Sequence, residues 1–239
     1  MHVQTGLEVM ALPLGASTLT ACCLGFDPAA FNAGMFDRAG IECPPRIARS
    51  VRKRQAEYFH GRLAAREAMA ALGRPLAAVG SAGNGAPLWP TGMIGSISHN
   101  DRLAVAAVAT TEGGLRGLGI DIERVIGADQ HESMLSLVVN RREHALLLKL
   151  DAGRSLPFSS GLTLAFSAKE SFYKAVSAVA GRVLEFDAIQ LTAIAGDGAG
   201  GQIHFQAVAA ISDEWFPGRR GQAGYMALPN GDLLTSFAW

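Results

Sequence analysis

Gly-Leu-Gly-Ile-Asp-Ile-Glu-Arg, residues 117–124, is the stretch on which the interpretation of this chain depends. Apolar and acidic residues alternate in it with the period of a β-strand, so Asp121 and Glu123 lie on one face of the strand. Ile120 and Ile122 lie on the other face. Two adjacent carboxylates repel each other, a bound cation relieves the repulsion, and oxygen ligands suit Mg²⁺ or Ca²⁺ better than Zn²⁺. The alternative, for an isolated Asp-x-Glu, is a solvated acidic face on an edge strand.

The composition indicates a globular protein without a strong overall charge. The 239 residues are 49% hydrophobic, enough for the core of one large domain or two small ones. Lys+Arg and Asp+Glu number 21 each, so no net charge attracts nucleic acid or an anionic membrane. Three cysteines, two of them adjacent, fit neither a disulfide framework nor a metal-ligand spacing. No apolar run spans a bilayer, and we expect a soluble cytoplasmic protein with no nucleic-acid or membrane partner.

Helical and strand patterns occur in two series that meet near residues 113–116. In the first series, residues 50–72 are helical in composition, and Gly73 and Pro75 follow as stop signals. We expect an α+β fold with an N-terminal half, residues 1–115, and a C-terminal half, residues 116–239. The remaining expected elements are strands within 6–25, 93–101, 103–109, 186–194, 203–211 and 225–239, helices at 141–150 and from Leu164, and a loop at 151–161.

Along the 50–72 helix, three arginines and Tyr58 follow one another at intervals of four. Arg54, Arg62 and Arg66 therefore form a row on one helix face. Such a row is usually a solvated face, but guanidinium groups also bind phosphate in a bidentate manner. His99 ends the 93–101 strand and, taken alone, is typical of a structural hydrogen bonder.

The segment that begins at Phe166 places Lys169 and Lys174, two of only four lysines in the chain, around Glu170. Two local explanations apply to this glutamate. Ser167 and Glu170 form a capping box if the helix begins at Ser167, and Glu170 with Lys174 is a favourable i,i+4 pair. In the preceding helix, Glu143 is an acid in the first turn, where the helix dipole favours it.

Three motifs in this order resemble those of the 4'-phosphopantetheinyl transferase superfamily. They are Gly-Ser-Ile-Ser-His (95–99), Gly-Ile-Asp-Ile-Glu (119–123) and Phe-Ser-Ala-Lys-Glu-Ser-Phe-Tyr-Lys (166–174). The arginine-rich helix and the Trp89-Pro90 loop are similar to the enterobactin synthetase component D branch. The resemblance implies a monomer of two similar α/β halves related by a pseudo-twofold axis, with coenzyme A in the cleft between them.

The resemblance also implies a reaction. The phosphopantetheine arm of coenzyme A passes to a serine of an apo acyl or peptidyl carrier protein, adenosine 3',5'-bisphosphate leaves, and the product serves siderophore or other secondary metabolite biosynthesis. The resemblance implies Asp121, Glu123 and Glu170 as ligands of Mg²⁺, and Glu170 as catalytic base with Glu143 as a second candidate. It implies Lys169 and Lys174 as phosphate ligands, with Lys174 also catalytic. Ser98 and His99 are expected beside a phosphate, and Arg54 and Arg62 at the 3'-phosphate.

One loop departs from the family pattern. Relatives often carry a basic residue before the Trp-Pro segment, whereas residues 82–87 read Ala-Gly-Asn-Gly-Ala-Pro and contain no Lys or Arg. The sequence therefore leaves open how the 3'-phosphate is held. Two other functions remain as alternatives: a non-catalytic relative that binds coenzyme A or a carrier protein, and a Mg²⁺-dependent phosphodiester hydrolase.

Overall fold

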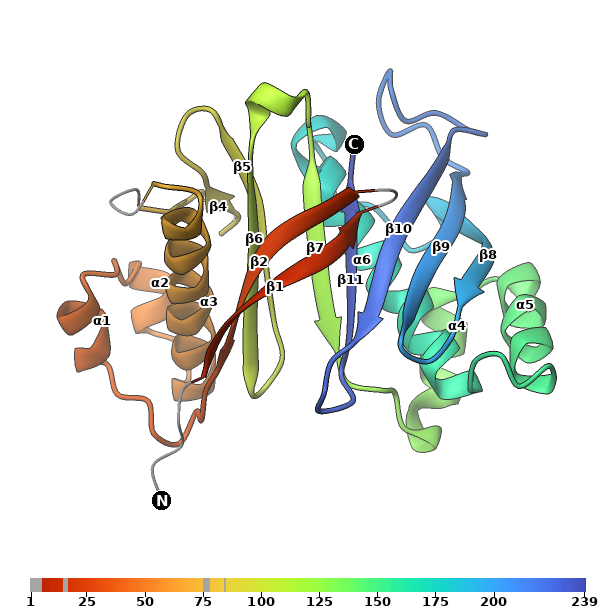
Figure 1. The fold of residues 1–239 in the computed structure, drawn as a ribbon, viewed down its shortest axis with the longest axis horizontal. Helices are drawn as coiled ribbons and strands as arrows, with labels where there is room; N and C mark the ends of the chain where they lie inside the picture. The colour runs from red at the N-terminus through yellow and green to blue at the C-terminus, as the bar shows by residue number, and fades with distance from the viewer. Residues whose placement is uncertain (1–5, 15–16, 75–77, 84) are drawn as a thin grey trace. The chain divides into compact units, whose positions relative to one another are not determined.

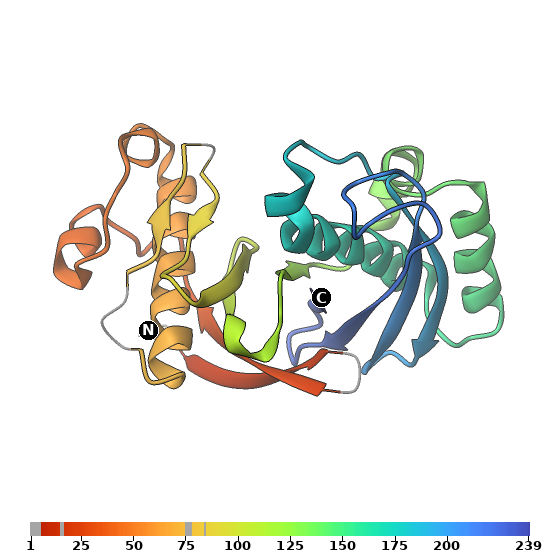
Figure 2. The same cartoon turned by 90° about the horizontal axis from the view of Figure 1, so that it is seen from above.

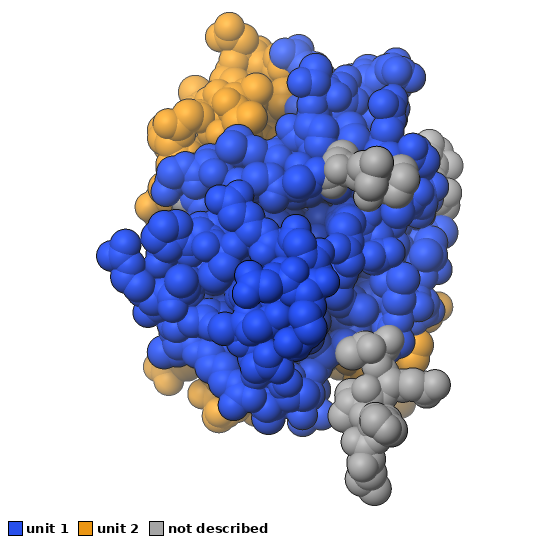
Figure 3. All heavy atoms as spheres, turned by 90° about the vertical axis from the view of Figure 1, so that its left-hand side faces the viewer, with its two compact units in different colours: residues 1–11, 19–116 blue, residues 12–18, 117–239 orange. Residues whose placement is uncertain are grey.

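A computed structural model describes the chain except residues 1–5, 15–16, 75–77 and 84 (Figure 1). The chain divides into two compact units, residues 1–11 with 19–116 and residues 12–18 with 117–239 (Figure 3). The division after Arg116 lies beside the boundary expected from the sequence. The segment 12–18, which belongs to the second unit, is the exception that the sequence did not indicate.

The first unit contains a four-stranded sheet in the order β1-β2-β6-β5. The long helix α3 packs against β5 and β6, as Figure 2 shows, and confirms the helix expected at 50–72. Phenylalanines from the loop before α1, from α1 and from α3 fill the core beneath this helix. The elements are β1 (Leu7–Leu14), β2 (Ser17–Gly25), α1 (Gly34–Ala39), α2 (Pro45–Ala48), α3 (Arg52–Ala71), β3 (Gly80–Ser81), β4 (Pro87–Leu88), β5 (Met93–His99) and β6 (Leu103–Thr110).

The second unit contains a five-stranded antiparallel sheet in the order β7-β11-β10-β9-β8. The longest helix, α6, packs against β7, β10 and β11. The elements are β7 (Leu118–Glu123), α4 (His131–Val138), α5 (Arg141–Ala152), α6 (Phe158–Ala180), β8 (Ile189–Gly196), β9 (Gly200–Ala207), β10 (Arg220–Ala227) and β11 (Leu233–Ala238), with a short 3₁₀ turn at Ala128–Gln130. A second 3₁₀ turn, at Thr111–Gly113, belongs to the first unit. None of the helices in the described part of the chain combines the length and hydrophobicity needed to cross a membrane.

Helix α6 begins at Phe158, earlier than the sequence indicated, and α5 extends to Ala152. The prediction of a loop over the whole of 151–161 is therefore wrong. Pro157 precedes the first turn, and the side chain of Asp151 accepts a hydrogen bond of 2.9 Å from the Phe158 amide. This bond satisfies an amide that has no partner within the helix. Ser167 consequently lies in the helix interior, so it cannot form the capping box with Glu170.

One face of α6 forms the aromatic core of the second unit. Phe172 and Val176 are buried as expected, and Phe172 meets Trp215 edge to face with ring centroids 4.9 Å apart. Phe205 and Phe237 complete this cluster around Phe172. Val179 was also expected to face inward but is 37% exposed, because it lies at the end of the helix, just before Ala180.

Two glycines allow β7 to approach α6 closely. A Cβ atom on Gly119 would lie 1.8 Å from the carbonyl oxygen of Ser171, and one on Gly117 would lie 2.1 Å from that of Ala175. Residues 117, 119, 121 and 123 share one face of the strand because side chains alternate. The face that has glycine at positions 117 and 119 therefore presents Asp121 and Glu123 toward α6.

We expect Gly119→Ala to lower the free energy of unfolding by about 1–3 kcal/mol or more, because the added methyl group forces β7 away from α6. Urea unfolding measures this change. Gly198→Ala in the turn between β8 and β9 is the control, since nothing lies within 4 Å of its added Cβ. Equal stability of the two variants would contradict the close packing of β7 on α6.

Candidate active site

Four carboxylates gather where β7, α6 and the turn before β11 meet. Burial raises the pKa of Glu123 to about 7, and the charges of Asp121, Glu170 and Asp232 act in the same direction, against that of Lys174. Burial also raises the pKa of Glu170, where Lys174 opposes the shift and Asp121 adds to it. The strand register explains why Asp232 lies near Glu123, since Leu233, the next residue after Asp232, pairs with Glu123. The structure therefore brings together the three acids that the sequence indicated.

Lys174 is the cation inside this group of acids. Its Nζ donates hydrogen bonds to Asp121 Oδ1 at 2.7 Å and to the carbonyl oxygen of Ile120 at 3.1 Å. The ion pair is partly buried, so the charge of Lys174 is less screened than at an open surface. Lys174 offsets part of the repulsion that raises the pKa values of Glu123 and Glu170.

A buried hydroxyl network sets the distance between α6 and β7. Ser167 Oγ donates to the carbonyl oxygen of Asp121 at 3.2 Å and lies 2.8 Å from Thr235 Oγ1. Ser171 Oγ lies 2.6 Å from the same Thr235 oxygen. Because these hydroxyls lie one helical turn apart on either side of Glu170, they fix the position of Glu170 and Lys174 along β7. The role of Ser171 and Thr235 was missed, although Ser167 and Ser171 are spaced i,i+4 in a mostly apolar helix.

The donor atoms are of the kind that suits a hard divalent cation, because they are carboxylate oxygens. In the described part of the chain, however, no three Asp, Glu, His or Cys side chains are arranged closely enough to hold a metal ion. Lys174 instead occupies one oxygen of Asp121. Mg²⁺ bound by Asp121, Glu123 and Glu170 remains a prediction.

Lys169 and Glu143 form a separate buried pair. Each side chain is 1% exposed, and Lys169 Nζ lies 2.9 Å from Glu143 Oε1 and donates to the carbonyl oxygen of Val138 at 2.6 Å. Glu143 also accepts hydrogen bonds from the amides of Asn140 and Leu191, each at 2.8 Å. Burial lowers the pKa of Lys169, and the charge of Glu143 acts in the opposite direction. These contacts join α5, α6 and β8, which is a structural role.

Glu143 is also part of a helix cap that the sequence interpretation overlooked. Asn140 caps α5 by accepting a hydrogen bond from the Glu143 amide, and the Glu143 carboxylate in turn accepts one from the Asn140 amide. The residue pair Asn-x-x-Glu is the sequence signal for this capping box. Catalysis by Glu143 and phosphate binding by Lys169 stay predictions that these contacts do not support.

In the first unit, the structure brings Arg54 and His99 together. Arg54 Nη1 lies 3.0 Å from His99 Nε2 and 3.3 Å from Glu57 Oε2. Glu57, which the sequence analysis did not single out, also lies 3.9 Å from His99 Nδ1. Ser98 is buried, and it points to the opposite face of β5 because side chains alternate along a strand. Arg54 and His99 therefore form one basic site without Ser98.

Arg62 is placed differently from Arg54. It is 7% exposed, and its Nη2 donates to the Gly80 carbonyl oxygen at 3.1 Å and to Ser81 Oγ at 2.8 Å. Its guanidinium also lies over the Tyr58 ring, 4.7 Å from the centroid. Arg62 therefore holds the β3–β4 hairpin. Because Arg62 is buried, a solvated helix face does not describe it, and its contact with a 3'-phosphate stays a prediction.

Comparison with known proteins identifies the family. Residues 44–109 match the 4'-phosphopantetheinyl transferase N-terminal domain, and residues 117–213 match the 4'-phosphopantetheinyl transferase superfamily. The chain is 34% identical over 194 residues to 4'-phosphopantetheinyl transferase Svp of Streptomyces mobaraensis, which covers 80% of this chain and 75% of Svp. It therefore belongs to the 4'-phosphopantetheinyl transferase superfamily.

Within that superfamily the chain is similar to enterobactin synthase component D. It is 35% identical over 166 residues to the Escherichia coli (strain K12) protein, covering 69% of this chain and 73% of the relative. The Salmonella typhi protein is 36% identical over 151 residues, covering 62% and 60%. Over the first relatives, the match spans between 52% and 65% of their own length. The family and branch inferred from the sequence motifs are confirmed.

We expect Glu143→Gln to lower the free energy of unfolding by about 3–5 kcal/mol, because it leaves the Lys169 ammonium buried without its counter-ion. The loss in the double variant Glu143→Gln/Lys169→Met should be smaller than the sum of the two single losses. Urea unfolding of the four proteins gives the coupling energy. Additive losses would show that the pair contributes no mutual stabilisation.

We expect the stability of the metal-free protein to fall as pH rises between 4.5, the ordinary pKa of Glu123, and about 7, its pKa in the fold. The folded state binds the proton more tightly than the unfolded state, so its advantage is complete below the lower value and lost through the higher one. Urea unfolding in EDTA across this range measures the slope. Glu123→Gln should flatten the profile, and parallel profiles for the two proteins would refute the shift.

Proposed function

We propose that this protein transfers the 4'-phosphopantetheine group of coenzyme A to a serine of an apo acyl or peptidyl carrier protein. Mg²⁺ is the proposed cofactor, and adenosine 3',5'-bisphosphate is the proposed leaving product. The observation that carries the proposal is the gathering of Asp121, Glu123 and Glu170 around Lys174, in a chain whose relatives include named 4'-phosphopantetheinyl transferases. The name enterobactin synthase component D supports a carrier in siderophore synthesis.

The acids of the second unit supply the metal ligands and the base in this proposal. Asp121, Glu123 and Glu170 hold Mg²⁺, which when bound neutralises charge on the diphosphate. The serine oxygen forms a bond to the phosphorus of the pantetheine side, and the bond from that phosphorus to the bridging oxygen breaks. The bridging oxygen leaves with adenosine 3',5'-bisphosphate. Glu170 accepts the serine proton in this proposal.

Lys174 and the basic site of the first unit supply positive charge. Lys174 is hydrogen-bonded to Asp121, and from that position it stabilises negative charge that develops on a phosphate oxygen. Arg54 and His99 hold a phosphate of coenzyme A in this proposal, since they lie 3.0 Å apart and the guanidinium of Arg54 has further donors besides the one that meets His99 Nε2. The expectations of a pseudo-twofold axis, a cleft for coenzyme A, a monomer and a cytoplasmic location stay predictions.

We expect Asp121→Ala to reduce transfer about a hundredfold or more, because it removes a ligand of the metal and the partner of Lys174. The measurement is the mass of an apo carrier protein after incubation with coenzyme A and Mg²⁺. Asp213→Ala, at an exposed acid of the same unit, is the matched control. Unchanged labelling by Asp121→Ala would reject the site.

The same assay separates the two alternative functions from the transferase. A non-catalytic relative binds coenzyme A or the carrier but leaves the carrier mass unchanged. A phosphodiester hydrolase consumes coenzyme A when no carrier is present. Wild-type labelling of the carrier, with coenzyme A stable in its absence, would support transfer over both.

A further inference from the structure

The sheet of the second unit has a polar face that no step of the proposed reaction uses. In β9, which lies between β8 and β10 (Figure 1), Ile203 and Phe205 point into the core of the unit. Because side chains alternate along a strand, His204 and Gln206 lie on the face away from this core. Arg220 of β10 is the direct partner of Gln206, so it shares that face.

A cavity of about 360 Å³ opens on this polar face. A bulge in β8 contributes to it. Leu191 pairs with Phe205 and Ala193 pairs with His204, so Thr192 is an extra residue with no partner residue in β9. Cavities that bind small molecules begin at about 300 Å³, so the space suits a small organic ligand. Its lining includes Thr192, Ala193, His204, Gln206, Arg220 and Gly221.

The cavity carries positive charge without an acid to balance it. Among its described lining residues Arg220 is charged, His204 becomes charged when protonated, and none is Asp or Glu. Within the part of the chain that the structure describes, no carboxylate forms an ion pair with either side chain. Arg220 is also exposed, so its guanidinium is accessible from solvent. A cation without a counter-ion, placed in a hollow of the surface, favours an anionic ligand.

The strand register places three hydrogen-bond donors around the cavity. Arg220 is the diagonal neighbour of His204, because its direct partner Gln206 lies two residues further along β9. Diagonal neighbours on one face lie about 7–8 Å apart, a separation that an anion between guanidinium and imidazole bridges. Thr192 adds a hydroxyl group from β8. The amide of Gln206 is already engaged, since its Nε2 donates to Gln190 Oε1 at 3.5 Å.

We propose that this cavity binds a phosphate group, with Arg220 as its main ligand and His204 and Thr192 as further donors. A guanidinium binds phosphate through two parallel hydrogen bonds. Donors from three adjacent strands suit a tetrahedral anion better than a planar carboxylate. Inorganic phosphate and a phosphate monoester share this chemistry. The site goes beyond the proposed function, whose carboxylates lie on the α6 side of the sheet. A merely solvated sheet face is the competing explanation.

The test is an NMR titration of the isotope-labelled full chain with inorganic phosphate, glycerol 3-phosphate and acetate at constant ionic strength. Phosphate should shift amide signals of β8, β9 and β10, and acetate should bind about tenfold more weakly. Tighter binding of glycerol 3-phosphate would identify a monoester as the ligand, and equal or weaker binding would identify free phosphate. Acetate that binds as tightly as phosphate, or unshifted signals in these strands, would overturn the proposal.

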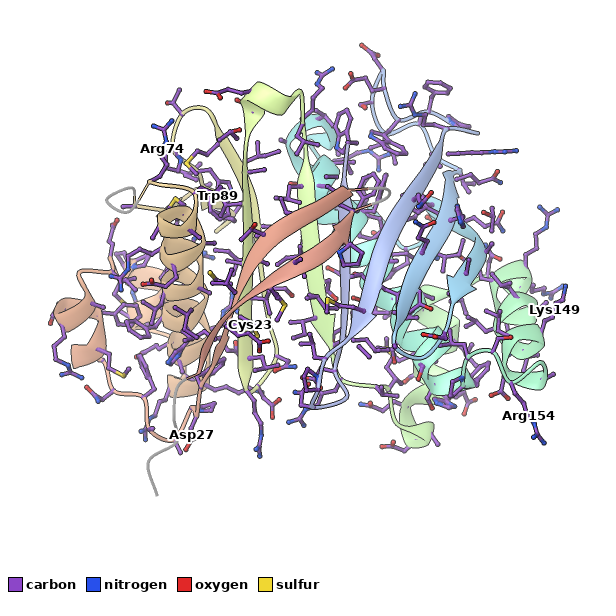
Figure 4. All side chains as sticks on the ribbon, viewed as in Figure 1. Cys23, Asp27, Arg74, Trp89, Lys149 and Arg154 are labelled. Carbon is purple, nitrogen blue, oxygen red and sulfur yellow. The ribbon has the colours of Figure 1, made fainter. Side chains whose placement is uncertain are left out.

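Arg220→Gln should weaken phosphate binding about tenfold or more, because it removes the charge and the paired hydrogen bonds. Arg154→Gln is the matched control. Arg154 is an exposed arginine in the turn between α5 and α6 and points outward (Figure 4), so its loss should leave the affinity unchanged. His204→Gln should weaken binding less than Arg220→Gln, and thermal unfolding confirms that each variant is folded. Equal affinity of the wild type and Arg220→Gln would contradict the site.

The carrier-labelling assay separates this inference from the proposed function. Arg220→Gln should label an apo carrier at the wild-type rate, since Arg220 takes no part in the proposed transfer. Slower labelling by this variant would assign Arg220 to the transfer reaction and overturn a separate site. Absence of labelling by the wild type counts against the proposed function alone, because the phosphate titration does not depend on transfer.

Discussion

The close packing of α6 on β7 is the constraint on which the rest of the site depends. Gly117 and Gly119 make the approach possible because a side chain at either position would overlap the helix backbone. The hydroxyls of Ser167, Ser171 and Thr235 then fix the register between helix and sheet. As a result, acids that are far apart in the sequence face each other. The glycines and the carboxylates belong to one alternating pattern. The same face of the strand therefore packs closely on the helix and places the carboxylates beside it.

The second unit has two groups of buried charged side chains, one around Lys169 and one around Lys174, and their charge balance differs. Lys169 and Glu143 neutralise each other and satisfy backbone groups of three elements, so this pair stabilises the scaffold. Around Lys174 the acids outnumber the cation, and burial raises the pKa values of Glu123 and Glu170. An excess of buried negative charge is unfavourable for the fold alone. It is favourable for a protein that binds a divalent cation and accepts a proton, which is the reason to place function there.

The first unit shows how the role of an arginine depends on its surroundings. Arg54, Arg62 and Arg66 share one helix face, yet Arg62 is buried against the β3–β4 hairpin and Arg66 donates to the carbonyl oxygen of Ala39. Only Arg54 stands beside His99. Arg46 of α2, outside the row, places its guanidinium beside Gly85, between β3 and β4. Spacing along a helix determines which side chains share a face, but the segments packed on that face determine which of them remain accessible.

The sequence by itself determined the family, the α+β class and the acids Asp121, Glu123 and Glu170, because strand alternation and short motifs are local properties of the chain. The helix at 50–72 and the β5–β6 and β10–β11 strand pairs follow from the same local signals. Only the tertiary structure decided that Lys174 pairs with Asp121, that Lys169 pairs with Glu143, and that Thr235 joins the hydroxyl network of Ser167 and Ser171. These contacts link residues far apart in the chain, and which of several possible partners a charged side chain meets is set by packing, which a local pattern does not contain.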